Sequence, residues 1–183
     1  MDDIIDLELE KIEKIIAKID SDPESEEVKE AEKHLWEKIY KKSGQGRRTG
    51  VGITAEGDML AAMGLRYGTE EATEFSEQVH KTIALEAYRS SVNMAKERGA
   101  FAIYDSEREK NNPFINRLKE ADPELYEEMK KYGRRNIACL TIAPTGTTSL
   151  MTQTTSGIEP VFMPVYKLSL IHISEPTRLR CIS

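Results

Sequence analysis

Apolar residues recur every three or four positions through most of the chain, and this spacing predicts a largely helical protein. The first such segment, residues 1–20, carries isoleucine and leucine on one side and acidic residues and lysines on the other. A second helix is expected from Asp22 to about Lys42, with Asp22 as the N-cap and Pro23 in the first turn. The side chains expected to face inward are Ile4, Ile5, Leu7, Ile12, Ile15, Ile16 and Ile19, followed by Val28, Ala31, Leu35 and Ile39.

The middle of the chain predicts a short helix and then the longest helix of the protein. The short helix is expected over residues 58–65, and the long helix over residues 69–98, where Gly99 ends it. The long helix is interpreted as a core helix because its apolar residues keep the helical spacing. These residues are Ala72, Phe75, Val79, Ile83, Ala87 and Met94. His34 and His80 are expected to be packed or exposed rather than catalytic.

Two short helices are expected next, over residues 113–121 and 123–132. Each begins with proline, which suits the first helical position because its missing N–H would have no partner there. Asp122 is the expected N-cap of the second, and Gly133 its expected end.

Two β-type runs complete the pattern, over residues 137–142 and 158–167. Pro160 and Pro164 indicate irregular or edge sections in the second run. Cys139 is interpreted as a small buried strand residue rather than a redox group. The expected fold class is therefore α/β, mostly helical, with two or three strands.

Composition narrows the function classes. The 183 residues suit one domain, and the net charge of −6 argues against a general nucleic-acid-binding surface. No run approaches the roughly 18 apolar residues of a membrane span, and the acidic N-terminus does not resemble a signal peptide. The two cysteines form no metal-binding or disulfide pattern. A cytoplasmic protein without nucleic-acid or membrane partners is expected.

The candidate chemistry lies between the two β-type runs. A strand that ends in proline and is followed by small hydroxyl residues and a helix start is typical of an anion site. The residues concerned are Pro144, Thr145, Gly146, Thr147 and Thr148. Glycine would let the backbone approach an anion closely, and the hydroxyls could donate hydrogen bonds. The pattern fits equally well an N-cap turn with spare hydroxyls.

A second glycine-rich stretch, SGQGRRTGVG at residues 43–52, carries a weaker signal. It lacks the Lys-Ser/Thr ending of a P-loop and the spacing of a dinucleotide-binding loop. We interpret it as a loop that leads into a buried turn.

The segment LTIAPTGTTSLMTQTTSGIEPVF, residues 140–162, resembles the catalytic subunit of ribonucleotide reductases, most closely the adenosylcobalamin-dependent class II. The likeness continues through residues 46–72 and 87–101 and covers nearly all of residues 1–167. It implies that Pro144, Thr145, Gly146, Thr147 and Thr148 hold the substrate phosphates, with residues 156–160 beside the same site. It also implies a fragment of the family's ten-stranded α/β barrel.

The resemblance implies that the full-length parent reduces ribonucleoside di- or triphosphates to deoxyribonucleotides by radical chemistry. It implies adenosylcobalamin as cofactor, a dithiol reductant such as thioredoxin, and a homodimer. The family's radical cysteine lies in an Asn-Pro-Cys-Gly-Glu run that these 183 residues do not contain. We therefore assign no catalytic residue, and we expect the fragment itself to be inactive.

Three alternatives stay open at this point. The chain could belong to a class I large subunit, whose dependence on cobalamin would differ. It could be an unrelated helical module that binds phosphate through the loop at residues 144–148. The charged helices of residues 1–42 could instead form an interaction module.

The last sixteen residues, 168–183, change character abruptly. LSLIHISEPTR, residues 168–178, is what a common transposase-type sequencing adapter encodes in one reading frame. We therefore expect residues 1–167 to be the C-terminal part of the barrel, truncated at both ends, with Met1 an internal methionine. Residues 168–183 are expected to be non-native, so His172 and Cys181 would carry no function.

Overall fold

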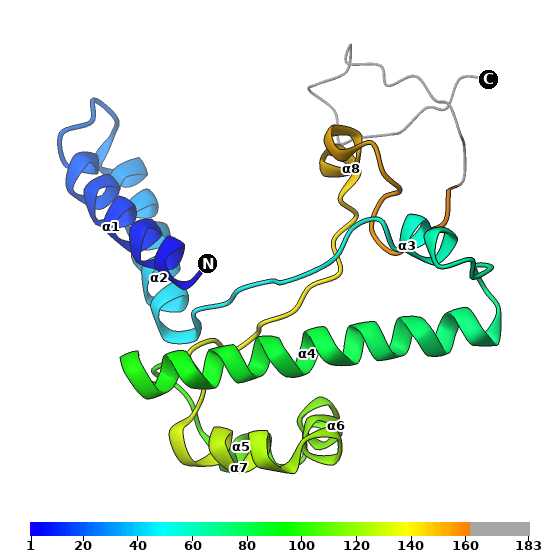
Figure 1. Cartoon of the computed structure of the whole chain (residues 1–183). Helices are drawn as coiled ribbons and strands as arrows, with labels where there is room; N and C mark the ends of the chain where they lie inside the picture. Colours follow the sequence, from blue (N-terminus) through cyan, green and yellow to red (C-terminus); the bar gives the residue numbers. More distant parts are fainter. Residues whose placement is uncertain (162–183) are drawn as a thin grey trace, which may run out of the picture. The chain divides into compact units, whose positions relative to one another are not determined.

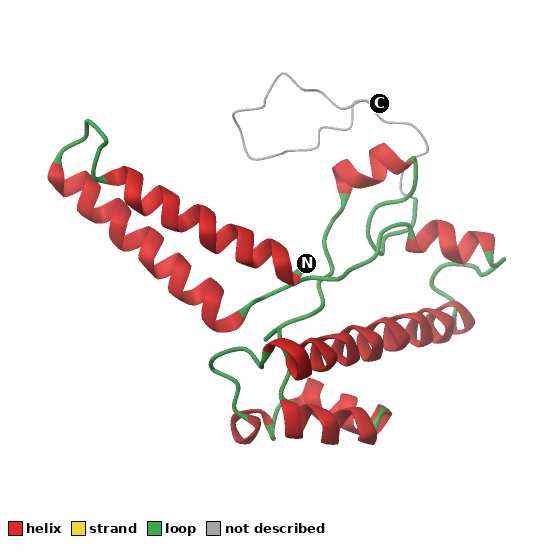
Figure 2. Cartoon of the chain, turned by 60° about the vertical axis from the view of Figure 1, so that its left-hand side comes forward, coloured by secondary structure: helices red, strands yellow, loops and turns green. Residues whose placement is uncertain are grey.

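A computed structural model describes residues 1–161 of the chain. Within them the structure contains eight α-helices and no β-strand (Figures 1 and 2). The helices are α1 (Asp2–Ile19), α2 (Glu26–Gly46), α3 (Glu56–Ala62), α4 (Glu70–Arg98), α5 (Ser106–Glu109), α6 (Pro113–Ala121), α7 (Pro123–Tyr132) and α8 (Gly146–Thr152). The chain forms two compact units. The first comprises Met1–Gly52 and Phe75–Thr141, and the second Ile53–Glu74 and Ile142–Ser183.

In the first unit, α1 and α2 lie side by side as a hairpin, as Figure 2 shows. Ile5, Ile12 and Ile19 are buried, as their spacing predicts. The expected apolar faces are nevertheless too wide. Ile4 is 65% exposed and Leu35 is 54% exposed, and Leu7, Val28 and Ala31 are exposed as well. The reason is that a partner helix covers only one stripe of each helix.

The predicted start of α2 is wrong. Ser25 precedes the helix, and Asp22 belongs to the turn that follows α1. The N–H of Ser21 donates to the carbonyl of Lys18 at 2.9 Å, and the N–H of Asp22 donates to that of Ile19 at 3.1 Å. These bonds continue the end of α1, the carboxylate of Asp22 pairs with Nζ of Lys18 at 3.2 Å, and α2 begins only at Glu26, so Asp22 does not cap it.

The core of the first unit lies between α4, α6 and α7. It consists of Tyr88, Val92, Ile115, Leu118, Leu125, Met129 and Cys139. The bounds of α6 and α7 are as predicted, and α4 lies within the predicted range, but its second half buries Tyr88, Val92 and Ala95 rather than the expected Ala87 and Met94, which are half-buried. The carboxylate of Asp122 accepts the N–H of Leu125 at 2.9 Å, which confirms its role as the N-cap of α7. Helix α5 was not predicted, because one turn of Ser-Glu-Arg-Glu carries no periodic signal.

The expected strand over residues 137–142 is not formed. Val51 and Leu140 make an isolated parallel bridge, supported by the N–H of Val51 on the carbonyl of Cys139 at 2.7 Å and the N–H of Thr141 on the carbonyl of Val51 at 3.0 Å. A single extended neighbour does not make a sheet. Residues 158–161 are not a strand either, and the rest of the second β-type run lies outside the described residues.

The glycine-rich stretch at residues 43–52 was expected to be a loop, but its first four residues form the end of α2, and only residues 47–52 lead into this pairing. A Cβ atom on Gly52 would lie 2.5 Å from the carbonyl oxygen of Thr141, so only glycine allows the two segments to approach this closely. Cys139 is buried as predicted, and burial raises the pKa of its thiol. No helix in the part of the chain that the structure describes is long and apolar enough to cross a bilayer.

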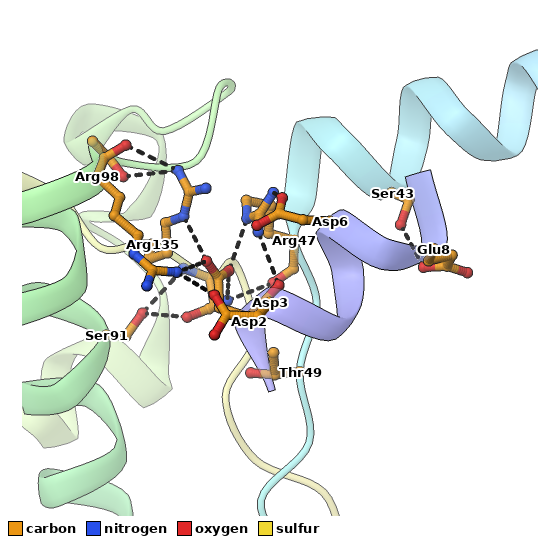
Figure 3. A network of polar contacts seen from close by, with 12 residues as sticks. Asp2, Asp3, Asp6, Glu8, Ser43, Arg47, Thr49, Ser91, Arg98 and Arg135 are labelled. Atoms are coloured by element: carbon orange, nitrogen blue, oxygen red, sulfur yellow. Dashed lines mark hydrogen bonds and ion pairs between the residues drawn. The ribbon is translucent and has the colours of Figure 1, made fainter. Parts of the chain in front are cut away.

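A buried polar network joins α1 to the rest of the first unit (Figure 3). The carboxylate of Asp2 accepts from Nε of Arg47 at 2.8 Å, Nε of Arg135 at 3.0 Å and Nδ2 of Asn136 at 3.1 Å. Asn136 in turn accepts from the hydroxyl of Ser91 at 2.9 Å. Every buried side-chain nitrogen and oxygen among the described residues has a partner, so this network carries no unsatisfied group.

Candidate functional site

The candidate anion-binding residues lie in the second unit, where the chain turns into α8. Thr145 precedes the helix with φ 51° and ψ 25°, in the left-handed region. For an L-residue this conformation costs about 1–2 kcal/mol, so the surrounding contacts must hold it. The N–H of Ser149 donates to the carbonyl of Thr145 at 2.8 Å and closes the first helical turn.

The backbone at the start of α8 presents free donors, that is, N–H groups with no acceptor among the described residues. The N–H groups of Gly146, Thr147 and Thr148 precede the first intrahelical hydrogen bond and have no acceptor within the helix. Gly146 is exposed, and a Cβ atom on it would meet no other atom within 4 Å. An anion could therefore approach this backbone closely.

Two hydroxyls add to these donors. Thr147 and Thr148 are exposed, and neither side chain makes a hydrogen bond to another described residue. No lysine or arginine occurs in residues 142–161. The donors of this segment are thus neutral N–H and O–H groups, the chemistry of a backbone cradle for phosphate oxygens.

Thr145 and Pro144 behave differently from the other three predicted residues. The hydroxyl oxygen of Thr145 accepts the N–H of Gly157 at 2.7 Å and lies 2.9 Å from the hydroxyl oxygen of Thr54. Pro144 is exposed and has no N–H to donate. The structure therefore brings Gly146, Thr147 and Thr148 together as donors and uses Thr145 inside the turn.

Residues 156–160, which the resemblance places beside the same site, contact this turn. The hydroxyl of Ser149 donates to the carbonyl of Gly146 at 2.8 Å, and its oxygen lies 2.9 Å from that of Ser156. Gly157 has φ 49°, and a Cβ atom on it would lie 3.1 Å from the carbonyl oxygen of Ala143. The two segments are thus held together by short polar contacts within the second unit.

Residues just before α3 and in its first turn complete this arrangement, and the sequence pattern did not single them out. The N–H of Ala55 donates to the carbonyl of Thr155 at 3.1 Å. Asp58 and Thr155 bond reciprocally, each backbone N–H donating to the other's side chain at 3.2 and 2.9 Å. Ala55 has φ 68°, which nothing in its residue type announces. The one available signal is the run of small and acidic residues at 54–58, where α3 begins.

One group of carboxylates lies elsewhere, in the first unit. Asp2, Asp3 and Asp6 bring their oxygens close together, but Arg47, Arg98 and Arg135 already pair with them. This cluster is a set of ion pairs and not a metal site.

Comparison with known proteins shows the family to which the chain belongs. A family model described as the ribonucleotide reductase barrel domain matches residues 24–176. The chain belongs to the ribonucleotide reductase family. The resemblance in the APTGTTS and SGIEP segments is therefore confirmed at the level of the family. The matched range ends within residues 168–183, the stretch predicted to be non-native, which lies outside the described residues.

Curated relatives of this ribonucleotide reductase chain carry two kinds of name. The chain is 36% identical over 138 residues to a vitamin B12-dependent ribonucleoside-diphosphate reductase of Thermoplasma acidophilum, and the match covers 75% of this chain and 16% of the relative. It is 32% identical over 126 residues to an enzyme of the same name from Mycobacterium tuberculosis, covering 68% of this chain and 15% of the relative. A ribonucleoside-diphosphate reductase subunit alpha of Chlamydia pneumoniae is 29% identical over 139 residues, covering 66% of this chain and 13% of the relative. The matched part of the chain thus spans only 13–16% of the length of these relatives.

Proposed function

We propose that this chain is part of a vitamin B12-dependent ribonucleoside-diphosphate reductase and carries its substrate phosphate-binding turn. The observation that carries the proposal is the set of free donors at the start of α8, three N–H groups and the hydroxyls of Thr147 and Thr148. The names of the B12-dependent relatives support the class. In this proposal the parent enzyme makes deoxyribonucleotides for DNA synthesis in the cytoplasm.

The role of the turn is to bind and orient. Hydrogen bonds from Gly146, Thr147 and Thr148 to phosphate oxygens fix one end of the ribonucleotide. The ribose is then held in one position relative to the reacting groups of the parent, which lowers the entropic part of the barrier. Pro144 contributes by stopping the extended backbone before the turn, and Thr145 by shaping the turn itself.

Adenosylcobalamin would supply the radical chemistry in the parent enzyme. The described residues do not fit that group. A cavity of about 450 Å³ in the first unit is an open groove lined by Leu35, Ile39 and the charged residues Glu8, Lys38, Lys42 and Arg48, together with Ser43. Such a charged, open lining is unsuited to enclosing a large corrin ring. We assign no residue of this chain to the cobalamin. The dithiol reductant and the homodimer likewise belong to the proposal for the parent.

A double substitution in the full-length parent enzyme tests the phosphate role. Thr147→Val with Thr148→Val keeps the side-chain shape and removes both hydroxyl donors. A hydroxyl that donates to a charged oxygen contributes about 1.5–3 kcal/mol, so binding of CDP should weaken about tenfold or more. Binding of cytidine, which has no phosphate, should not change. Thr152→Val, which removes a hydroxyl from the other end of α8, is the matched control. Unchanged CDP affinity in the double variant would leave only the N-cap interpretation.

A class I reductase is the second candidate, because the Chlamydia pneumoniae relative is named a reductase subunit alpha without mention of vitamin B12. Activity of the parent enzyme with and without added adenosylcobalamin separates the two. A parent that is fully active without cobalamin, and only with a second subunit, would favour class I.

A further inference from the structure

Thr54 contacts the candidate phosphate turn without belonging to it. Its hydroxyl oxygen lies 2.9 Å from that of Thr145 and 3.2 Å from the carbonyl oxygen of Thr155. Thr54 comes just before α3, far from both partners in sequence, and all three residues lie in the second unit. Its side chain therefore links the start of α8 to the segment that follows α8.

Counting the hydroxyl protons fixes the direction of these bonds. The carbonyl of Thr155 can only accept, so it takes the proton of Thr54. Thr145 then donates its own proton to the oxygen of Thr54, while its oxygen accepts the N–H of Gly157 at 2.7 Å. The hydroxyl of Thr145 has no second proton to offer a phosphate. Its place in the turn is structural, although its position within the APTGTTS motif suggested direct binding.

The hydrogen bond with Thr54 holds Thr145, the residue whose backbone conformation sets the direction of α8. Thr145 is in the left-handed region, and the next three N–H groups are the free donors of the turn. Both bonds of its hydroxyl run to residues outside the helix, Thr54 and Gly157. Without them nothing on the side chain of Thr145 would hold this conformation.

We propose that Thr54 and Thr145 are positioning residues that aim the donors of Gly146, Thr147 and Thr148 at the substrate phosphates. This inference rests on the proposed function of the turn. The segment around Thr54 has other anchors, namely the N–H of Ala55 on Thr155 and the reciprocal bonds between Asp58 and Thr155. Removal of the Thr54 hydroxyl should therefore loosen the turn without unfolding the unit.

The test is a mutant cycle on CDP binding in the full-length parent enzyme. Thr54→Val alone should weaken CDP binding about fivefold to tenfold and leave cytidine binding unchanged. On the Thr147→Val/Thr148→Val background the same change should cost threefold or less, because a residue that acts through those donors loses most of its effect when they are gone. Thr54→Ser should restore binding, since serine keeps the hydroxyl. Thr49→Val is the matched control: it removes a threonine hydroxyl bonded to the carbonyl of Ala138 at 3.2 Å in the first unit.

The outcomes separate this inference from the function on which it rests. If the Thr147→Val/Thr148→Val variant binds CDP normally, the phosphate role is wrong and the positioning role falls with it. If that variant is weakened while Thr54→Val binds normally, or if the two effects simply add, only the positioning role is wrong. A Thr54→Ser variant as weak as Thr54→Val would also overturn it, because packing and not the hydroxyl would then matter.

Hydrogen exchange gives a readout that does not depend on binding. In this 183-residue chain, Thr145→Val removes the acceptor of the Gly157 N–H, so that amide should exchange at least tenfold faster. The Thr145→Ser variant should exchange at the wild-type rate. Equal rates in all three proteins would show that the contact does not hold the turn.

Discussion

Asp2 and Arg47 form a buried ion pair, with Nε of Arg47 2.8 Å from Oδ1 of Asp2 and both side chains 6% exposed or less. Arg47 also donates through a second nitrogen to the backbone carbonyl of Asp2 at 3.0 Å. The pair thus joins the first residue of α1 to the residue that follows α2. Arg135 shares the same carboxylate, and Arg47 pairs with a second one, that of Asp6, at 2.8 Å.

The first prediction compares Asp2 with its neighbour. Asp2→Ala leaves Arg47 and Arg135 partly buried with one carboxylate fewer, and we expect it to lower the free energy of unfolding by about 3–5 kcal/mol. Asp3→Ala breaks an ion pair with Arg98 on the surface, where Asp3 is 76% exposed, and should cost less than about 1 kcal/mol. Urea denaturation followed by circular dichroism measures both. Similar losses for the two variants would contradict the central role of Asp2.

The second prediction concerns pH. Burial by itself would raise the pKa of Asp2, but the hydrogen bonds from Arg47 and Arg135 outweigh it and hold that pKa below its usual value. The stabilisation from ionised Asp2 is therefore fully present above the unfolded pKa of about 3.9 and is lost as the pH falls through the lower, folded pKa.

Asp2→Asn isolates this contribution, because Asp3 and Asp122 also have lowered pKa values and contribute to acid unfolding in both proteins. The difference in unfolding free energy between the wild type and Asp2→Asn should be large near pH 7 and should shrink at pH values below about 4. A difference that stays constant across this range would show that Asp2 titrates as it does in the unfolded chain.

The sequence predicts those parts of the structure whose causes are local. Asp122-Pro123 and Gly133 determine both ends of α7 through a side-chain cap and a glycine at positive φ. The start of α2 was misplaced because Asp22-Pro23 carries the same signal, yet Asp22 belongs to the turn after α1 and its carboxylate pairs with Lys18. The prediction of a strand over residues 137–142 was wrong because a β-type run forms a strand only where neighbouring segments pair with it.

The candidate site was likewise predicted only in part. Gly146, Thr147 and Thr148 were predicted from their residue types and lie where an anion could reach them. Thr145 was assigned as a donor, and only the contact with Thr54, 91 residues away along the chain, reveals that its hydroxyl is already used. Thr54 itself was not found, because a long-range hydroxyl contact leaves no periodic signal in one sequence.

Gly133 provides a prediction about packing. It has φ 73°, and a Cβ atom would lie 2.5 Å from Cβ of Ala100 and 3.1 Å from the ring of Tyr104. Gly133→Ala combines this clash with a backbone conformation (φ 73°, ψ −166°) that essentially only glycine adopts, and should destabilise the chain by more than about 2 kcal/mol. Gly99→Ala, at φ 83° with nothing within 4 Å, should cost only about 1 kcal/mol. Thermal unfolding distinguishes the two, and a smaller loss at Gly133 than at Gly99 would contradict the contact.

The exposed apolar residues of the hairpin lead to a prediction about association. Val28 and Leu35, seven residues apart on α2, share one exposed face of the helix. We expect this chain to self-associate through this exposed face. Leu35→Lys should then reduce light scattering at a given concentration without loss of helicity. Leu125→Lys places a charge at a position that is 1% exposed and should unfold the core. Unchanged scattering in Leu35→Lys would place the association elsewhere.

The last prediction separates binding from stability at two glycines of the candidate site. Gly146→Ala adds a methyl group that meets nothing within 4 Å, at a residue inside α8, so the free energy of unfolding should change by less than about 0.5 kcal/mol. Gly157→Ala adds one at φ 49°, 2.6 Å from Oε2 of Glu159 and 3.1 Å from the carbonyl of Ala143, and should destabilise the second unit by more than about 1 kcal/mol. In the parent enzyme Gly146→Ala should nevertheless weaken CDP binding several-fold, because the new methyl group stands where the phosphate must approach the backbone, and Gly146→Val should weaken it further. Hydrogen exchange and CDP titration on the same variants measure the two effects. Normal CDP affinity in Gly146→Val would show that the phosphate does not approach the start of α8.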